Sequence, residues 1–578
     1  MTGWIKVGYW QYRALAVVAI FLYTKAVPVR RDEPWTVLLC KFSEPDYEIH
    51  SPDWFRLWFD GETLDGSITK YFRDISNGMY NIHSANLLGW FHIPLTKRDV
   101  RLLAMADASL ADVGNAERKI ALKAKEVCVK YALQKYGHSL TAKVITFVNT
   151  MKAAIFCPIR GILISPHFFM TAAVTHEIVH SLHIGHSFSD RQAKVYPHAE
   201  PGEYDDSYDL MSTANAYSYR SFYGLTGPGL NGPHLDYLGW LPADRVHFFT
   251  FAQTQGIFHL STLSLPHHMT KDWLLLLVPY DRDDPQKVFT VELRTAINYD
   301  RGLPSSRVLV HQIENRNGFY YSKLLRAQPS RYNAVRFLSK WRFVNPSIVG
   351  GAFIEIETTA LHKHSAIVKI SGNFTPTVCV EGEVQRKVFS QDDLVCVIRE
   401  EQRLISSAFN EQSQRRDLHQ NCADKLHEYK TMFNQTVCLT SKELATVIRQ
   451  DRRWKHYQQF YNMPTYGLNM CKPGFVWRLI DAYDYVCVWP NRTSAEATNR
   501  KLWKSTLPIE QNCPSNLVFR NAFPGDMLCV DIDQRQLVQH ENDLSETRLR
   551  YFKFFNGIDK IPYNKNTFLA KSYRLRQH

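Results

Sequence analysis

In the first 240 residues, short hydrophobic runs alternate with one long segment of helical period. Residues 35–42, 144–148 and 162–164 are rich in branched and aromatic side chains and are too short for helices, so they predict buried strands. Residues 112–136 carry hydrophobic side chains at helical spacing and are followed by Gly137, which predicts a helix that ends there.

Ser165 and Pro166 predict the start of a second helix. Serine commonly caps the first turn of a helix, and proline is favoured at its first position. The chain from there to about Leu182 has the composition of a helix. Together these strands and helices predict an α/β domain over residues 27–245.

The pattern changes after residue 245. Five hydrophobic runs, each of strand length, are separated by turn residues. They lie at residues 273–278, 288–293, 307–312, 353–358 and 366–370. Residues 246–372 are therefore predicted to form a β-rich, sandwich-like domain that packs on the first domain.

The last third of the chain contains an internal repeat marked by cysteines. Eight of the 11 cysteines form four pairs separated by 16 or 17 residues. The pairs are Cys379 and Cys396, Cys422 and Cys438, Cys471 and Cys487, and Cys513 and Cys529. Units this small bury little hydrophobic surface, so we predict one disulfide within each copy. The four copies span residues 373–556, and a tail covers residues 557–578.

An arginine and an aspartate also recur within the copies. The arginine lies seven residues after the first cysteine, and the aspartate lies three residues before the second. These residues are Arg386, Arg478 and Arg520 with Asp393, Asp484 and Asp526, whereas the second copy has Tyr429 and Gln435. We expect a salt bridge inside each unit, because a charge pair at a fixed place in a small unit is usually structural. A ligand-binding role is the alternative.

The N-terminus has the order of a secretory signal peptide. A positively charged start is followed by ten hydrophobic residues, 14–23, and then by a small residue. Residues 1–26 are therefore predicted to be removed on export, with an uncleaved membrane anchor as the alternative. Three N-glycosylation acceptors, Asn373, Asn434 and Asn491, also fit a secreted glycoprotein. No later segment is long and hydrophobic enough to span a membrane.

The charge of the chain is positive but not concentrated. The formal net charge is +13, and the lysines and arginines are spread over 578 residues without a basic block. Because no common nucleic-acid motif accompanies this charge, we do not expect a nucleic-acid partner. A basic secreted protein that favours acidic polymers or surfaces is the simpler interpretation.

The segment from His176 to His186 predicts a metal site. His176 and His180 are four residues apart, so a helix places them about 40° apart around its axis and both can reach one ion. Glu177 follows the first histidine, where its carboxylate can reach a water on that ion and act as general base and acid. His186 can supply a third ligand if the chain turns back after the helix, which leaves a fourth position open on Zn²⁺.

The histidine spacing resembles that of the metzincin zinc peptidases, and Met211 lies where their methionine turn follows the third ligand. The resemblance implies that Met211 forms an apolar floor under three histidine ligands. The family has a glycine where this chain has His183. Histidine tolerates a positive φ at a cost of about 1 kcal/mol, so the turn either forms there or shifts towards Gly185. His183 is the alternative third ligand.

Further segments are similar to the gametolysin-like metzincins and their uncharacterised secreted relatives. They include residues 71–76, 203–212, 238–241 and 299–304. The resemblance covers residues 35–312. It implies a zinc endopeptidase with His176, His180 and His186 as ligands and Glu177 as catalyst. Because family members act on extracellular matrix or cell-wall glycoproteins, it also suggests such a substrate.

Two smaller features stay open at this point. Cys128 and Cys157 can form a disulfide, but the sequence does not decide their pairing. Asp205, Asp206 and Asp209 can bind a structural cation, although their spacing is not that of a calcium loop. A solvated loop is the preferred interpretation of these three aspartates.

Two functions therefore compete. The first is a secreted zinc endopeptidase whose repeats help it to bind a protein or glycoprotein substrate, an extracellular matrix or a cell-wall polymer. The second is a catalytically inactive, peptidase-like binding protein that attaches to such a surface through its repeats. The presence of all three histidines and Glu177 favours the enzyme.

Overall fold

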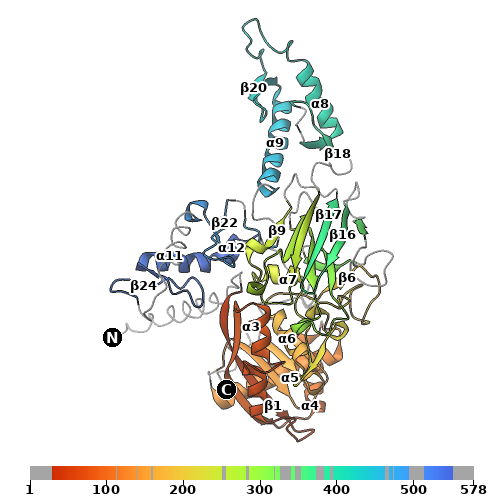
Figure 1. The fold of residues 1–578 in the computed structure, drawn as a ribbon, viewed down its shortest axis with the longest axis vertical. Helices are drawn as coiled ribbons and strands as arrows, with labels where there is room; N and C mark the ends of the chain where they lie inside the picture. Colours follow the sequence, from red (N-terminus) through yellow and green to blue (C-terminus); the bar gives the residue numbers. More distant parts are fainter. Residues whose placement is uncertain are drawn as a thin grey trace, which may run out of the picture.

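A five-stranded sheet organises the N-terminal part of the chain (Figure 1). Its strands are β1 (Arg31–Phe42), β2 (Tyr80–Ile93), β3 (Lys143–Val148), β4 (Ala154–Cys157) and β5 (Gly161–Ile164). They are arranged in the order β2-β1-β3-β5-β4, and only the edge strand β4 runs antiparallel to its neighbour. The predicted strands at 35–42, 144–148 and 162–164 are confirmed.

Helices cover both faces of this sheet. Helices α2 (Pro52–Asp60), α3 (Ile68–Ile75) and α6 (Thr171–His180) pack on one face, and α4 (Lys97–Ala106) and α5 (Ala116–Tyr136) pack on the other. The side chains of β1 alternate between the two cores, because successive residues of a strand point to opposite faces. The structure therefore confirms the predicted α/β character.

Some elements differ from the sequence prediction. The helix predicted at 112–136 begins at Ala116, where the side chain of Asn115 caps it, and it ends before Gly137 as predicted. The helix predicted from Pro166 begins at Thr171, because residues 166–168 form a separate 3-10 turn. Strand β2 and helices α2, α3 and α4 were not predicted. Capping residues in the sequence indicate the start of two of these helices, namely Ser51 before α2 and the Thr96–Asp99 capping box of α4.

A disulfide joins the sheet to α5. Cys40 on β1 bonds Cys128 on α5, with 6.1 Å between their Cα atoms. The suggested pairing of Cys128 with Cys157 is therefore wrong. Cys40 lies on the face of β1 that packs against α5, whereas Cys157 lies at the end of the edge strand β4.

The next segment forms two further sheets that share a hydrophobic core. The four-stranded sheet contains β10 (Gln255–Ser261), β17 (Ser365–Gly372), β16 (Phe353–Leu361) and β15 (Lys340–Val344). Its inward side chains pack against those of a six-stranded sheet in a single cluster. The predicted β-rich sandwich is therefore confirmed.

The six-stranded sheet reaches back into the first domain. Its order is β6 (Phe188–Ser189), β14 (Phe319–Leu324), β13 (Arg307–Arg316), β12 (Val288–Arg294), β11 (Leu275–Pro279) and β9 (Val246–Phe248). Strand β6 follows His186 directly and pairs with β14. The sandwich is therefore hydrogen-bonded to the chain that carries the third predicted ligand.

Each of the four copies contains a small β-hairpin. The hairpins are β18–β19 (Glu383–Gln385, Cys396–Ile398), β20–β21 (His427–Lys430, Thr436–Leu439), β22–β23 (Val476–Trp477, Cys487–Val488) and β24–β25 (Val518–Phe519, Cys529–Val530). Disulfides join Cys422 to Cys438, Cys471 to Cys487 and Cys513 to Cys529, as predicted. Helices α8 (Arg399–Asn410), α9 (Ser441–Tyr461) and α11 (Ile532–Asp543) follow three of the hairpins, and α12 (Ser545–Arg548) follows α11.

The predicted salt bridges occur within three copies. The arginine Nε lies 2.9 Å from the aspartate in Arg386–Asp393, 2.8 Å in Arg478–Asp484 and 2.8 Å in Arg520–Asp526. All six residues are buried. The structural interpretation of this pair is therefore supported.

The copies also associate in twos. Arg386 of the first copy reaches Asp451 at 2.8 Å, on the helix that follows the second copy. Arg478 of the third copy reaches Glu541 at 3.1 Å, on the helix that follows the fourth copy. In each case the arginine of one copy also pairs with a carboxylate on the helix of its partner copy.

The two pairs of copies lie in different places (Figure 1). The first pair, with α8 and α9, lies at one end of the molecule, beyond the sandwich. The second pair packs on the first domain, where the Tyr485 hydroxyl donates to the Leu241 carbonyl at 2.8 Å. In the same contact, the Ala243 amide donates to the Ala482 carbonyl at 2.7 Å. Leu468, just before the third copy, belongs to the main hydrophobic core.

The computed structural model describes residues 29–550 except 112, 138–139, 158–160, 250–254, 281–285, 318, 326–339, 345–352, 373–382, 391–392, 394, 462–467, 473 and 494–512. The predicted signal peptide, the tail, Asn373 and Cys379 lie outside these residues. Asn434 and Asn491 are both exposed. Within the described part of the chain, no helix is long and apolar enough to cross a membrane.

Replacing Arg478 with alanine should destabilise the second pair of copies strongly. The change leaves the buried carboxylate of Asp484 without its cation, which typically costs about 3–5 kcal/mol, and it removes one of the two arginines that contact Glu541. Arg316→Ala is the matched control, because Arg316 is half exposed beside Glu314 and such pairs contribute about 1 kcal/mol or less. Urea unfolding monitored by tryptophan fluorescence measures both variants. Equal destabilisation by the two changes would contradict the structural role of Arg478.

Candidate metal centre

Helix α6 presents the first two histidines from a fully buried position. Every residue of the helix is buried. Near its N-terminus, the Trp58 indole donates to the Thr171 hydroxyl at 3.0 Å, which ties the helix to α2. His176 and His180 lie on successive turns of this fixed helix, so their rings project to the same side, as the spacing predicted.

The turn after the helix forms at His183. The amide of His183 donates to the His180 carbonyl at 3.0 Å, and the φ of His183 is 66°. Histidine therefore adopts the left-handed conformation for which glycine was expected, while Gly185 has no positive φ. The turn survives the substitution and does not shift.

This turn brings His186 to the other two histidines. One ligand atom from each of His176, His180 and His186 lies within 4.8 Å of the others, and all three residues are buried. Among the described residues, this is the one group of histidine, cysteine or carboxylate side chains that could hold a metal ion. His183, the alternative third ligand, is not part of it.

Each ring is held by its Nδ1 atom. Nδ1 of His176 lies 3.1 Å from the Leu210 carbonyl, and Nδ1 of His180 lies 2.8 Å from the Ile184 carbonyl. Nδ1 of His186 lies 2.6 Å from Oε1 of Glu203. Because carbonyls and carboxylates only accept, Nδ1 carries the proton in each ring and Nε2 is the unprotonated nitrogen. That tautomer is the one a metal ligand requires.

Burial keeps these imidazoles neutral. It lowers the pKa of His176 to about 3, with a further contribution from the nearby His186. Burial also lowers the pKa of His180 well below its usual value, and it lowers that of His186 against the opposing effect of Glu203. Neutral rings with convergent Nε2 atoms form a prepared site for a cation.

Two more groups lie at this site. Glu177, the predicted general base, is 8% exposed and follows His176 on the helix. The Tyr204 hydroxyl lies 3.0 Å from Nε2 of His186. Burial raises the pKa of Tyr204, and the charges of Glu203 and Glu177 raise it further.

Met211 lies in the segment that supports His176. It is fully buried in the hydrophobic core, and its carbonyl accepts from the Ser187 amide at 3.4 Å. The preceding residue, Leu210, provides the carbonyl that holds His176. The methionine segment therefore contacts both ends of the ligand sequence through its backbone.

The three aspartates before Met211 do not form a solvated loop, so that interpretation is wrong. Asp206 and Asp209 are fully buried, and Asp205 is 9% exposed. Asp206 pairs with His311 at 2.9 Å, and Asp209 pairs with His234 at 3.1 Å. The sequence could not indicate these pairs, because the histidine partners lie far from the aspartates in the chain, on β13 and on α7 (Gly232–Tyr237).

Asp209 joins four parts of the site. One carboxylate oxygen accepts from the Ser187 hydroxyl and from the Met211 amide. The other accepts from the Asn231 amide at 2.6 Å. Together with the His234 pair, these contacts join Ser187, which follows the third ligand His186, to the segment around Met211 and to α7.

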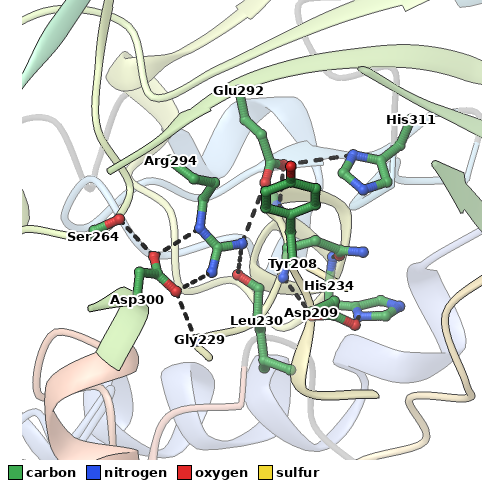
Figure 2. Close-up of polar contacts among 12 residues, drawn as sticks. Tyr208, Asp209, Gly229, Leu230, His234, Ser264, Glu292, Arg294, Asp300 and His311 are labelled. Atoms are coloured by element: carbon green, nitrogen blue, oxygen red, sulfur yellow. Dashed lines mark hydrogen bonds and ion pairs between the residues drawn. The ribbon is translucent and has the colours of Figure 1, made fainter. Parts of the chain in front are cut away.

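A buried charged cluster under this region comes from the sandwich, as Figure 2 shows. Arg294 on β12 contacts Asp300 at 2.5 Å and Glu292 at 3.4 Å, and it donates to the Leu230 carbonyl at 3.2 Å. Glu292 accepts from the Gly232 amide at 2.6 Å. The sandwich thus fixes the loop that leads into α7.

This cluster is connected to the first ligand through the backbone. Asp300 accepts from the Gly229 amide at 3.0 Å, and the Gly229 carbonyl accepts from the Leu210 amide at 3.2 Å. The Leu210 carbonyl then holds Nδ1 of His176. Two domains therefore contribute to the orientation of one imidazole.

Sequence reasoning missed the residues that orient the ligands. Glu203 and Tyr204 lie in residues 203–212, which were noted for their similarity to gametolysin-like metzincins. No spacing rule connected these two residues to His186. Arg294 and His311 lie in segments that pattern alone identifies as strands. The one available signal for Arg294 and His311 was a charged or titratable residue within an otherwise hydrophobic strand.

No protein-family model matches this chain, and no curated protein was found to match it. The assignment of a function to the site rests on its own residues.

Replacing Glu203 with glutamine should weaken metal binding about 10- to 100-fold. The amide can still accept from Nδ1 of His186, but it lacks the charge that makes the ring a stronger ligand. Competition with a chelating dye measures the affinity. Glu62→Gln, an exposed carboxylate beside Arg73, is the control and should change nothing. An unchanged affinity in Glu203→Gln would refute the role of Glu203.

The His311–Asp206 pair should make stability depend on pH. Burial opposes a charged His311 ring, but the hydrogen bond and charge of Asp206, with Glu292 and Asp209, outweigh it and raise the pKa of His311. The stabilisation is therefore fully present below the unfolded-state pKa of about 6.5, and it is lost as pH rises through the higher folded-state pKa. His311→Asn should remove this loss. Urea unfolding from pH 6 to 9 tests it, and an identical pH slope in the variant would disprove the linkage.

Proposed function

We propose that this protein is a secreted zinc endopeptidase of the metzincin type. The observation that carries the proposal is the buried triad of His176, His180 and His186, with each Nδ1 held by an acceptor and Glu177 beside the first ligand. Three imidazoles and one adjacent carboxylate form the residue set that hydrolytic zinc sites use.

The donor set fits zinc. Histidine nitrogens bind zinc at about 2.0–2.1 Å, so ligand atoms of a tetrahedral site stand about 3.4 Å apart. The nitrogens here already lie within 4.8 Å of one another, and small rotations of the rings would close the difference. Three protein ligands leave one position open, which is the mark of a catalytic rather than a structural site.

A bound zinc ion supplies Lewis-acid polarisation of the scissile carbonyl and lowers the pKa of a water to about 7. Glu177 then accepts the proton of the attacking water and returns it to the leaving amine. Its burial beside the histidines favours this role, because a carboxylate shielded from solvent interacts more strongly with a nearby proton. The histidines themselves stay neutral throughout, since burial opposes their protonation.

Two features support the metzincin type. The left-handed φ of His183 gives the chain the reversal that this motif requires before the third ligand. Met211 follows the ligands in the expected order, is fully buried and is joined to Ser187 by a backbone hydrogen bond.

The compartment and the substrate follow from the remaining chain. A disulfide in the first domain and three in the repeats support an oxidising, extracellular location. The first pair of repeat copies, with α8 and α9, lies at the other end of the molecule from α6 (Figure 1), so a large partner bound there would not cover the histidines of that helix. We therefore propose a protein or glycoprotein substrate, such as an extracellular matrix or cell-wall polymer.

Glu177→Gln should retain one zinc per chain and lose proteolysis. Loss of a general base typically lowers kcat about 10²- to 10⁴-fold, whereas the ligands are untouched. Metal analysis of the purified protein, together with casein or gelatin cleavage with and without a chelator, measures both properties. Stoichiometric zinc without chelator-sensitive cleavage in the unmodified protein would instead favour the inactive binding protein. A protein that binds no zinc would overturn the endopeptidase.

A further inference from the structure

Tyr204 has no role in the mechanism above, yet its hydroxyl lies among the ligand atoms. The hydroxyl is 3.0 Å from Nε2 of His186, which is the nitrogen that the proposed zinc site needs. The two rings pack against each other with 4.1 Å between their centroids. Contact with Nε2, rather than with Nδ1, places the phenol on the metal-facing side of the imidazole.

The backbone is arranged to hold Tyr204 there. Its φ is 63°, an uncommon conformation for an aromatic residue. Its amide donates to the Ser187 carbonyl at 2.9 Å, and the preceding Glu203 forms an antiparallel bridge with Phe188. The ring of Tyr196 packs edge-on against that of Tyr204 at 5.3 Å. Unusual backbone geometry that neighbouring contacts maintain is typical of functional sites.

The same contact cannot persist once His186 gives its Nε2 lone pair to a metal. The Tyr204 O–H then loses Nε2 of His186 as its acceptor but stays beside the ligand atoms. The carboxylates of Glu203 and Glu177 act on the phenol through their charges. A scissile carbonyl at the open position would lie beside the same hydroxyl, because that hydroxyl contacts the nitrogen with which His186 would bind the metal. Of these, only the carbonyl oxygen becomes more negative as water attacks.

We propose that Tyr204 is a catalytic residue whose hydroxyl donates a hydrogen bond to the scissile carbonyl oxygen as negative charge develops on it. This inference rests on the proposed endopeptidase function and assigns a second catalytic group to it. No proton is transferred by Tyr204. Proton transfer belongs to Glu177, whereas the phenol stabilises charge.

Tyr204→Phe tests the proposal, with Tyr196→Phe as the matched control. Removal of one such donor typically lowers kcat 10²- to 10³-fold, and we expect a loss of this size with KM changed less than about threefold. Tyr196→Phe should cleave like the unmodified protein, because it removes a neighbouring hydroxyl and keeps the ring that packs against Tyr204. Zinc content and zinc affinity should not fall in either variant.

A phosphinic peptide provides a readout besides turnover. Its tetrahedral oxygens imitate the charged carbonyl, so its affinity should fall in Tyr204→Phe by about the same factor as kcat. The affinity for the corresponding product peptide should hardly change. Tyr204→Gln, which retains a donor, should keep more activity and more phosphinic-peptide affinity than Tyr204→Phe, and it serves as the second variant if the phenylalanine chain folds poorly.

Three results would overturn the proposal. Unchanged kcat in Tyr204→Phe would show that the hydroxyl takes no part in the reaction. A loss of zinc that accounts for the whole loss of activity would make Tyr204 a structural support of His186. Equal activity of Tyr204→Phe and Tyr204→Gln would show that no donor is needed. Failure of the proposed function is distinct, because the unmodified protein would then show no chelator-sensitive cleavage at all.

Discussion

Three imidazoles form a metal site only when their Nε2 atoms converge, and here every ring is fixed through its opposite nitrogen. The acceptors are the carbonyls of Leu210 and Ile184 and the carboxylate of Glu203. They come from the methionine segment, from the turn after α6 and from the strand-like chain beside β6. Since none of these segments is a regular part of the helix, the geometry of the site depends on how loops are held.

Buried charges from the sandwich hold those loops. A buried ion pair contributes little net stability, because desolvation offsets most of its attraction, but it strongly penalises any arrangement that leaves one partner alone. Arg294 satisfies Asp300, Glu292 and the Leu230 carbonyl at once, which fixes the loop before α7 in one position. The α/β domain and the sandwich are therefore separate along the sequence but act together in holding the ligands in place. The α/β domain contains the ligands, and the sandwich sets their support.

Local rules predicted what depends on local sequence. The strands of the first sheet, the end of α5 at Gly137 and the placement of His176 with His180 follow from periodicity and spacing. The disulfides and salt bridges of the repeats follow from recurrence. Contacts between distant segments were beyond such rules. The three aspartates looked solvated because their histidine partners lie up to 105 residues away, and Cys40 was not linked to Cys128 because that pairing depends on which face of β1 meets α5.

The arginine–carboxylate contacts between repeat copies also limit how the number of copies can change. Arg386 contacts Asp451, and Arg478 contacts Glu541, so the buried arginines of the first and third copies each use the helix that follows the next copy. Loss of the second or the fourth copy alone would leave one guanidinium without its distal carboxylate, whereas loss or gain of an associated pair would leave both of these contacts matched. We therefore expect changes in repeat number to be tolerated when two associated copies are lost or gained together. The unit of such a change is the associated pair of copies and not the single hairpin.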